Sequence, residues 1–283
     1  MPKTAHRTIW EAPLLFFSDL DGTFLADDKS VSPASWAALD AIAAAGGQFV
    51  PCSGRAYSGI YPELLAHPAV HYAICANGAA VVDAKTGAAV HRECLGKPRA
   101  LAMYEVARGH DVTFDVFADG ECYAMRRHWE RLGEYVADPH ILASMRSTRT
   151  PVDVEISELI EQVEALERVA MYWKDPADRD ALWPAAEALP QVSVVRSYPM
   201  NIEVSDARGT KGGALRWLAD YLGVDAAETV GFGDQLNDVS MIVAAGTGCA
   251  MANAEPEALA AADVVVASND EDGVARYILE RLG

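Results

Sequence analysis

The amino-acid sequence predicts an α/β protein, with a doubly wound, Rossmann-like parallel sheet as its core and an α+β domain inserted into that core. In residues 1–82 and 205–283, short apolar segments end in polar, glycine-containing loops and helical patterns follow, which is typical of β-loop-α units. Residues 83–204 differ, because two strand-like segments joined by Ala118-Asp119-Gly120 predict an antiparallel hairpin. We therefore assign 1–82 and 205–283 to the core and 83–204 to the insert.

The first half of the core begins with the apolar run 14–17, which lacks polar alternation and is typical of a strand buried on both faces. Ser32 and Pro33 predict the N-cap and first turn of a helix that ends at Gly46. Asn77-Gly78 predicts a turn between two strands. The other elements expected in this half are a strand at 48–52, a helix at 58–65 and strands at 72–75 and 80–82.

The insert is expected to mix strands and helices before the parallel pattern resumes. Its predicted helices are 100–108, 157–166 and 176–189, and its predicted strands are 112–117, 121–125, 152–156, 168–173, 192–197 and 201–204. A helix with an apolar stripe then follows 209–213 and ends at Gly223. Strands at 229–232, 248–251 and 264–267 and a helix at 273–282 complete the core.

Composition and charge exclude several classes of protein. Of the 283 residues, 51% are hydrophobic and 23% charged, which indicates a folded globular chain. The net charge of −18 argues against nucleic acid or an anionic membrane surface as the main partner. No apolar run approaches the ~20 residues that cross a bilayer, and residues 1–13 lack the apolar centre of a signal peptide. The five cysteines form no CxxC pair, so we expect reduced thiols and a cytoplasmic location.

Acidic residues gather where predicted strands end. Asp19 and Asp21 follow the first strand, and Asp234 follows the strand at 229–232. The carboxyl ends of parallel strands share one edge of the sheet, where ligands bind. Two carboxylates about 4 Å apart repel by about 4 kcal/mol at a surface-like dielectric, so a shared proton, a basic side chain or a metal ion must offset the repulsion. For Asp19 and Asp21 taken alone, a simple strand-end turn is the alternative.

Other polar residues occupy equivalent positions. Ser53-Gly54-Arg55 supplies a hydroxyl, a close backbone approach and a guanidinium, which suit a phosphate group, although a helix N-cap is the alternative. Lys211 is expected in the first turn of a helix, where the helix dipole disfavours a cation, so it either acts outside the helix or is a solvated lysine. Asp238 lies four residues after Asp234, on the same helix face, beside Asn237.

The order of these residues resembles the four motifs of the haloacid dehalogenase (HAD) superfamily, whose members are mostly phosphatases. The matching motifs are Asp19-x-Asp21-Gly22-Thr23, Ser53-Gly54-Arg55, Lys211 and Gly233-Asp234-x-x-Asn237-Asp238. Further segments resemble the Cof-type subfamily, which carries a C2-type cap between motifs two and three: Asn77-Gly78, Met251-Ala252-Asn253-Ala254, Ala262-Asp263 and Asp272-Gly273-Val274. The predicted insert falls in that interval, and Ser53 stands where many relatives carry threonine.

This resemblance implies a Mg²⁺-dependent phosphatase that hydrolyses a small phosphorylated metabolite, such as a sugar phosphate, through an aspartyl-phosphate. It implies Asp19 as nucleophile and Asp21 as general acid and base. It also implies a magnesium site formed by Asp19, Asp234 and the backbone carbonyl of Asp21. The residues implied to bind phosphate or substrate are Ser53, Gly54, Arg55, Asn77, Lys211 and Asn237, with Gly22, Thr23 and Asp238 in support.

Two other functions stay open on the sequence. A phosphomutase would share the core but return the phosphoryl group to the sugar instead of to water. A non-catalytic phosphometabolite binder would not need both Asp19 and Asp21. The sequence does not name the substrate, because the aromatic residues of the insert fit either a specificity surface or core packing; they include Tyr123, Trp129, Tyr172 and Trp173.

Overall fold

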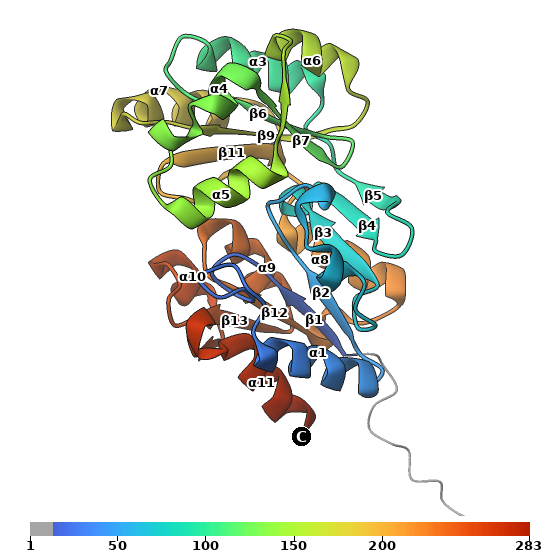
Figure 1. Cartoon of the computed structure of the whole chain (residues 1–283). Coiled ribbons are helices and arrows are strands. Elements are labelled where there is room, and N and C mark those ends of the chain that lie inside the picture. Colours follow the sequence, from blue (N-terminus) through green and yellow to red (C-terminus); the bar gives the residue numbers. More distant parts are fainter. Residues whose placement is uncertain (1–13) are drawn as a thin grey trace, which may run out of the picture.

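The computed structural model describes residues 14–283, and residues 1–13, where we expect no signal peptide, lie outside the described part. Figure 1 shows two α/β bodies, one above the other, with the chain crossing between them twice. One crossing lies between strand β5 (Ala89–Arg92) and helix α3 (Lys97–Ala107). The other lies between strand β11 (Asn201–Asp206) and helix α8 (Lys211–Leu222). This arrangement confirms the predicted fold class.

The lower body contains a parallel sheet with strand order β14-β13-β12-β1-β2. β1 lies between β12 and β2 and runs parallel to both. Its side chains pack on both faces, Phe16 into one hydrophobic cluster and Leu15 and Phe17 into another. Burial on both faces explains why this strand is apolar throughout. The strands are β1 (Leu15–Ser18), β2 (Gln48–Pro51), β12 (Thr229–Gly233), β13 (Thr247–Met251) and β14 (Val264–Val266).

Helices cover both faces of the parallel sheet. α1 (Pro33–Ala44) and α11 (Gly273–Leu282) contribute to the cluster around Phe16, whereas α8 and α9 (Val239–Ala244) contribute to the cluster around Phe17. Ser32 caps α1 by accepting a hydrogen bond from the backbone N–H of Ser35, and Pro33 opens the helix, as predicted. The remaining core α-helices are α2 (Pro62–Leu65) and α10 (Pro256–Ala261).

A small antiparallel sheet adjoins the parallel one. It consists of β3 (Tyr72–Cys75), β4 (Ala80–Asp83) and β5, and a bridge between Cys52 and Ile74 connects it to the end of β2. The turn between β3 and β4 contains Asn77, whose φ is +62°. The helix expected at 58–65 is wrong in extent, because a 3₁₀ turn covers Tyr57–Gly59 and α2 begins only at Pro62. Proline lacks the N–H that a continuous helix needs.

The upper body, which we call the cap, is built on a sheet of order β10-β11-β9-β6-β7-β8. The predicted hairpin is β6-β7, and helices α3, α6 and α7 pack on one face of the sheet. The other face turns toward the core (Figure 1). The strands are β6 (Asp115–Ala118), β7 (Glu121–Met125), β8 (Thr150–Val152), β9 (Leu166–Tyr172) and β10 (Val192–Val195), and the helices are α4 (Arg126–Glu130), α5 (Pro139–Thr148), α6 (Ile156–Gln162) and α7 (Pro176–Glu187).

The structure differs from the sequence expectations at several places in the cap; the helix expected at 157–166, for example, ends at Gln162, and β9 begins at Leu166. The strand expected at 152–156 is wrong, because β8 ends at Val152 and α6 begins at Ile156. The buried residues Ile156, Leu159 and Ile160 follow the helical i, i+3, i+4 spacing. Helix α5 was not predicted, because Met145 alone is buried among its residues and no apolar stripe marks it.

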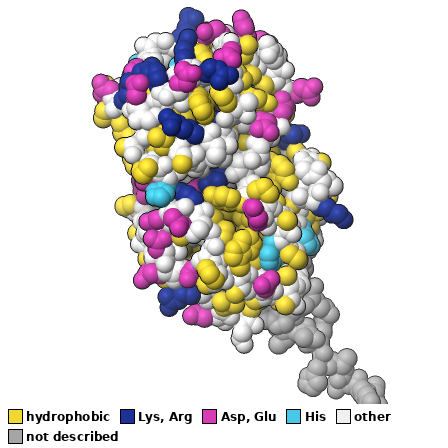
Figure 2. Space-filling view, viewed as in Figure 1, with side chains coloured by type: hydrophobic (Ala, Val, Ile, Leu, Met, Phe, Trp, Pro, Cys, Tyr) yellow, Lys and Arg dark blue, Asp and Glu magenta, His cyan; other side chains and the backbone are white. Residues whose placement is uncertain are grey.

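The boundaries expected at 82/83 and 204/205 stay predictions. β5 lies beyond residue 83 and pairs with β4, and β11 runs from 201 to 206. Within residues 14–283, no helix combines the length and the apolar character needed to span a bilayer. On the face that Figure 2 shows, lysine and arginine side chains are interspersed with aspartate and glutamate.

Candidate active site

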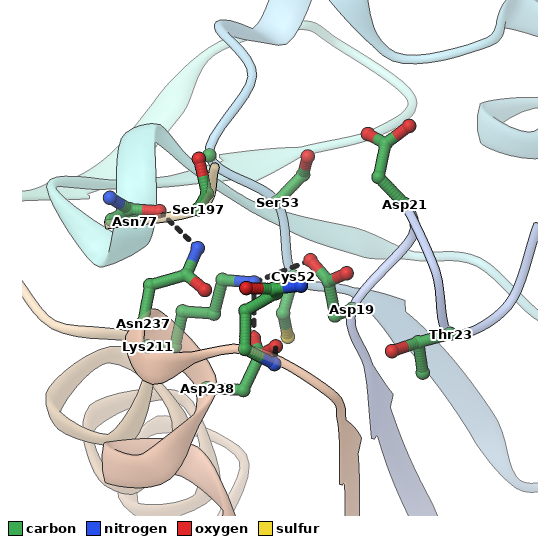
Figure 3. A network of polar contacts seen from close by, with 12 residues as sticks. Asp19, Asp21, Thr23, Cys52, Ser53, Asn77, Ser197, Lys211, Asn237 and Asp238 are labelled. Atoms are coloured by element: carbon green, nitrogen blue, oxygen red, sulfur yellow. Dashed lines mark hydrogen bonds and ion pairs between the residues drawn. The ribbon is translucent and has the colours of Figure 1, made fainter. Parts of the chain in front are cut away.

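The polar residues of the sequence motifs meet at the carboxyl edge of the core sheet (Figure 3). Asp19 follows β1 directly, and its backbone N–H donates to the carbonyl of Phe232 at 2.9 Å. Ser53 lies just after β2, Asp234 follows β12, and Lys211 begins α8. Because these strands are parallel and adjacent, their ends place residues far apart in sequence side by side.

Lys211 is the central charge of the site. Its side chain is 0% exposed, and its Nζ lies 2.5 Å from Asp19 Oδ1 and 2.5 Å from Asp238 Oδ1. Burial alone would lower the pKa of Lys211, but the two carboxylates overcome burial and raise it, so the lysine stays charged. The lysine that the helix dipole disfavours is therefore held by two buried ion pairs.

Asp238 fixes the loop that follows β12. Its Oδ2 accepts hydrogen bonds from the backbone N–H groups of Asp234 and Gln235, each at 3.0 Å, while Oδ1 accepts from Lys211. Gly233 permits this approach, since a Cβ at that position would lie 2.3 Å from the Cβ of Asp238. Both oxygens of Asp238 are thus engaged by protein donors.

Asp19, Asp234 and Asp238 form a buried carboxylate cluster, with one oxygen of each within 4.8 Å of the others. Burial raises the pKa of Asp19; Lys211 opposes this rise, and the neighbouring carboxylates add to it. Burial and repulsion from Asp238 raise the pKa of Asp234 to about 7. Three acids therefore face one lysine, and the cluster holds fewer basic groups than acidic ones.

A divalent cation that prefers hard oxygen ligands fits this donor set. Asp19 and Asp234 suit it as acidic ligands, because both oxygens of Asp238 are engaged. Thr23 Oγ1 donates to Asp234 Oδ1 at 2.7 Å and orients that carboxylate. Gly22 leaves room beside it, since its φ is +87° and a Cβ there would lie 2.5 Å from Asp234 Oδ2.

The carboxylate of Asp21 is paired with basic groups outside this cluster. Arg55 Nε and Nη2 donate to its two oxygens, each at 2.9 Å, and Lys29 Nζ lies 3.1 Å from Oδ1. Burial alone would raise the pKa of Asp21, but Arg55 and Lys29 overcome this effect and lower it to about 2. The resemblance implies that Arg55 binds phosphate or substrate, and in the structure its guanidinium forms a bidentate ion pair with Asp21.

Asn77 and Asn237 connect the core site to the cap. Asn237 Nδ2 donates to Asn77 Oδ1 at 3.2 Å, and Asn77 Nδ2 donates to Glu203 Oε2 on β11 at 2.5 Å. Ser53 Oγ accepts a hydrogen bond from the backbone N–H of Arg55 at 3.1 Å. Its hydroxyl hydrogen is therefore available to a ligand.

A cavity of about 420 Å³ lies between this site and the cap. The core wall contains Asp19, Asp21, Ser53, Gly54, Arg55, Asp234 and Asn237, and the cap wall contains Phe117, Met145, Arg149, Arg168, Tyr172 and Glu203. Among the aromatic residues considered from the sequence, Tyr172 lines the cavity, whereas Trp173 lies in the hydrophobic core of the cap.

Sequence reasoning missed Arg149, Arg168 and Glu203. A signal existed for Glu203, because polar and apolar residues alternate along β11 and predict one polar face. The apolar residues Ile202 and Val204 pack into the hydrophobic core of the cap, so Glu203 points the other way, toward the site. The partners of this polar face depend on how the cap packs on the core, which the pattern of β11 does not give.

Comparison with known proteins identifies the class. A family model of haloacid dehalogenase-like hydrolases matches residues 16–278, and the chain belongs to this family. Phosphatase YwpJ from Bacillus subtilis is 30% identical over 278 residues, which cover 92% of this chain and 96% of the relative. Pyridoxal phosphate phosphatase YbhA from Escherichia coli is 26% identical, over 93% and 97% of the two chains. A solved haloacid dehalogenase-like hydrolase from B. subtilis has a TM-score of 0.83 at 28% identity, over 94% and 98% of the two chains.

These findings confirm the family and the enzyme class predicted from the motifs. The chain is a HAD-type phosphatase, an enzyme that acts on phosphorylated substrates.

Proposed function

We propose that this enzyme is a Mg²⁺-dependent phosphatase that hydrolyses a small phosphorylated metabolite, such as a sugar phosphate, through an aspartyl-phosphate on Asp19. The observation that supports this proposal most directly is the placement of Asp19, a buried carboxylate beside Lys211, on the floor of a cavity of about 420 Å³. That volume suits a small metabolite. The acidic net charge of −18 supports a partner other than nucleic acid or an anionic membrane, and the location proposed is the cytoplasm.

In the proposed first step, an oxygen of Asp19 attacks phosphorus and the bond from phosphorus to the substrate oxygen breaks. Lys211 and the Ser53 hydroxyl would bind the phosphoryl oxygens as negative charge shifts onto them. The leaving oxygen takes a proton from Asp21, and in the second step Asp21 removes a proton from the water that cleaves the aspartyl-phosphate. Mg²⁺ held by Asp19, Asp234 and the backbone carbonyl of Asp21 would supply the positive charge that lets an anionic nucleophile meet an anionic substrate.

The pairing of Asp21 with Arg55 affects the first step. An acid whose pKa is about 2 carries no proton near neutral pH, so Asp21 in this arrangement is suited to act as a base. We propose that substrate entry breaks the contacts from Arg55 and Lys29 to Asp21, which would allow Asp21 to take up a proton. Arg55 would then be free to contact the substrate.

The test compares Asp19→Asn and Asp21→Asn with a phosphate-labelled aryl phosphate in Mg²⁺. An aryl leaving group hardly needs a proton, so the Asp21 variant should still phosphorylate Asp19. Loss of the base should slow the second step by about 10²–10⁴-fold, so this variant should accumulate a hydroxylamine-sensitive phosphoprotein. The Asp19 variant should stay unlabelled, and label on it would show that the nucleophile is misassigned.

The same assay separates the alternatives. Release of inorganic phosphate from a sugar phosphate supports the phosphatase, whereas conversion of that sugar phosphate without phosphate release would indicate a phosphomutase. Binding without any turnover would indicate a non-catalytic binder.

A further inference from the structure

Arg149 is a buried arginine that the proposed chemistry does not use. It lies between α5 and β8, its side chain is 7% exposed, and it lines the cavity. Its Nε donates to Asp115 on β6 at 2.7 Å, while Nη1 and Nη2 reach protein acceptors only at 3.5 Å, the carbonyl of Met145 and the hydroxyl of Tyr172. Asp115 thus anchors one edge of the guanidinium, and the outer nitrogens keep most of their donor capacity.

Arg168 is a second buried arginine in the same wall of the cavity. It lies on β9, four residues before Tyr172 and on the same face of the cap sheet, and it is 3% exposed. Its Nη2 donates to the carbonyl of Gly54, and its guanidinium stacks 3.6 Å from the centre of the Phe117 ring. Among the described residues, its Nε and Nη1 have no hydrogen-bond partner.

The acid beside Arg168 accepts hydrogen bonds from three other side chains. Glu203 Oε1 lies 3.3 Å from Arg168 Nη1, but it accepts from Ser197 Oγ at 2.8 Å and from Asn201 Nδ2 at 3.2 Å. Its Oε2 accepts from Asn77 Nδ2. The outer nitrogens of Arg149 have long hydrogen bonds, and Arg168 Nε has no acceptor among the described residues. Poorly satisfied buried donors cost free energy, so we expect a ligand to supply an acceptor to these arginines.

The geometry points to a second anion-binding position in the cap wall, at which Arg149, with Arg168 beside it, binds a carboxylate or second phosphate on the leaving group of the substrate. The inference rests on the proposed function and deepens it, because it defines the substrate class as phosphate esters with an additional anionic group. Arginine suits this role, since its planar fork binds a carboxylate or a phosphate through two parallel hydrogen bonds.

The test measures kcat/KM for matched substrates in Mg²⁺. One pair compares 2-phosphoglycolate with ethyl phosphate and reports on a carboxylate. The other compares propane-1,3-diol bisphosphate with 3-hydroxypropyl phosphate and reports on a second phosphate. In at least one pair the enzyme should prefer the anionic member by about tenfold or more, as a charge-assisted hydrogen bond predicts. The pair that shows the preference identifies the anionic group.

Arg149→Lys keeps a positive charge for Asp115 but removes the planar fork. The ratio of kcat/KM for the anionic substrate to kcat/KM for its neutral partner should therefore fall by about tenfold, toward one. Arg126→Lys is the matched control, because Arg126 forms a bidentate ion pair with Asp153 on the cap and is 44% exposed. Its preference should equal that of the wild type. If Arg149→Lys does not fold, as judged by its thermal midpoint, the double variant Arg149→Gln, Asp115→Asn replaces it and should lose the preference in the same way.

Hydrolysis of p-nitrophenyl phosphate distinguishes failure of the anion-binding position from failure of the proposed phosphatase function. If the wild type cleaves this ester but prefers neither anionic substrate, the anion-binding position is overturned and the phosphatase stands. Full preference in a folded variant at position 149 would overturn it as well. If the wild type cleaves no phosphate ester at all, the proposed function fails, and the inference fails with it.

Discussion

The position of Lys211 is explained by single contacts in the site. A lysine in the first turn of a helix opposes the helix dipole, and this one is also completely buried. Asp19 and Asp238 compensate both costs, since each places an oxygen 2.5 Å from Nζ. Even so, the nearby acids outnumber the lysine, and a cation is the natural complement of the remaining charge.

We predict that turnover depends on a bound metal ion. EDTA should abolish turnover and Mg²⁺ should restore it. Mg²⁺ should also raise the thermal midpoint, because a ligand of the folded state adds about 2.7 kcal/mol of stability at a hundredfold excess over its Kd. Asp234→Asn should lose this rise, whereas Asp40→Asn, a change at a side chain that is 80% exposed, should keep it. Full activity of the stripped protein in EDTA would contradict the prediction.

Glu167 allows a prediction on pH. It is 1% exposed, and neither carboxylate oxygen has a hydrogen-bond partner among the described residues. Burial raises its pKa from 4.5 to about 7, although Arg92 opposes the rise. The folded state therefore binds more protons than the unfolded state between these values, so the stabilising contribution is complete below the lower value and is lost as the pH rises through the upper one.

Glu167→Gln should remove this dependence. The wild type should lose on the order of 2–3 kcal/mol of unfolding free energy from Glu167 between about pH 5 and about pH 8, and the variant should not lose it. Urea denaturation at both pH values measures the difference. Glu164→Gln is the control, because Glu164 is exposed and should behave as the wild type does. Equal pH dependence in Glu167→Gln and the wild type would show that Glu167 does not titrate in this range.

At the scale of elements, the loop after β1 must turn sharply beside the acidic cluster. Gly22 combines a positive φ of +87° with a position where a Cβ would lie 2.5 Å from Asp234 Oδ2. The first condition disfavours other residues through backbone strain, and the second would displace a proposed metal ligand. These two effects can be separated by comparison with another glycine.

Gly22→Ala should lower kcat/KM by about 10²-fold or more, because a displacement near 1 Å at a catalytic group has that effect. Gly46→Ala is the matched control. Its φ is +71°, but a Cβ at that position would have nothing within 4 Å, so the variant should lose only about 1–2 kcal/mol of stability and keep its kinetics. Similar kinetics for both variants would mean that Asp234 tolerates the shift.

At the scale of the whole molecule, the core and the cap have separate hydrophobic clusters. Leu39 of α1 packs with the parallel sheet, whereas Leu182 of α7 packs with the cap sheet. The cavity lies where the two bodies meet, so each supplies one wall. Polar contacts cross this boundary; for example, Arg196 Nη1 of the cap donates to Glu255 Oε1 of the core at 2.6 Å.

The proposed division into core and cap is testable by hydrogen exchange. Leu182→Ala should destabilise the cap by about 2–5 kcal/mol, as buried leucine truncations do, and should raise amide exchange mainly within 83–204. Leu39→Ala should raise exchange mainly within 1–82 and 205–283. Uniform loss of protection in both variants would show that the two bodies unfold as one unit.

Much of the core was predictable because its helices and strands are marked by patterns of neighbouring residues. The apolar run of β1 reports burial on both faces. Asp19 and Asp234 follow their strands directly and Ser53 lies two residues after β2, so strand ends alone placed them on one edge. The capped start of α1 is local in the same way, since Ser32 and Pro33 act on neighbouring backbone groups. Helix α5 lacked such a signal, because it buries little of its own surface.

The sequence by itself determined the fold class, the family and the edge of the sheet at which the motif residues meet, since each depends on residues close in the chain or in fixed motif order. Tertiary structure alone decided that Arg55 pairs with Asp21 and that Arg149, Arg168 and Glu203 form the opposite wall of the cavity. The physical reason is that a side chain acts on whatever its face meets. Strand alternation gives the face of Glu203, but only the packing of the cap on the core gives that face a partner.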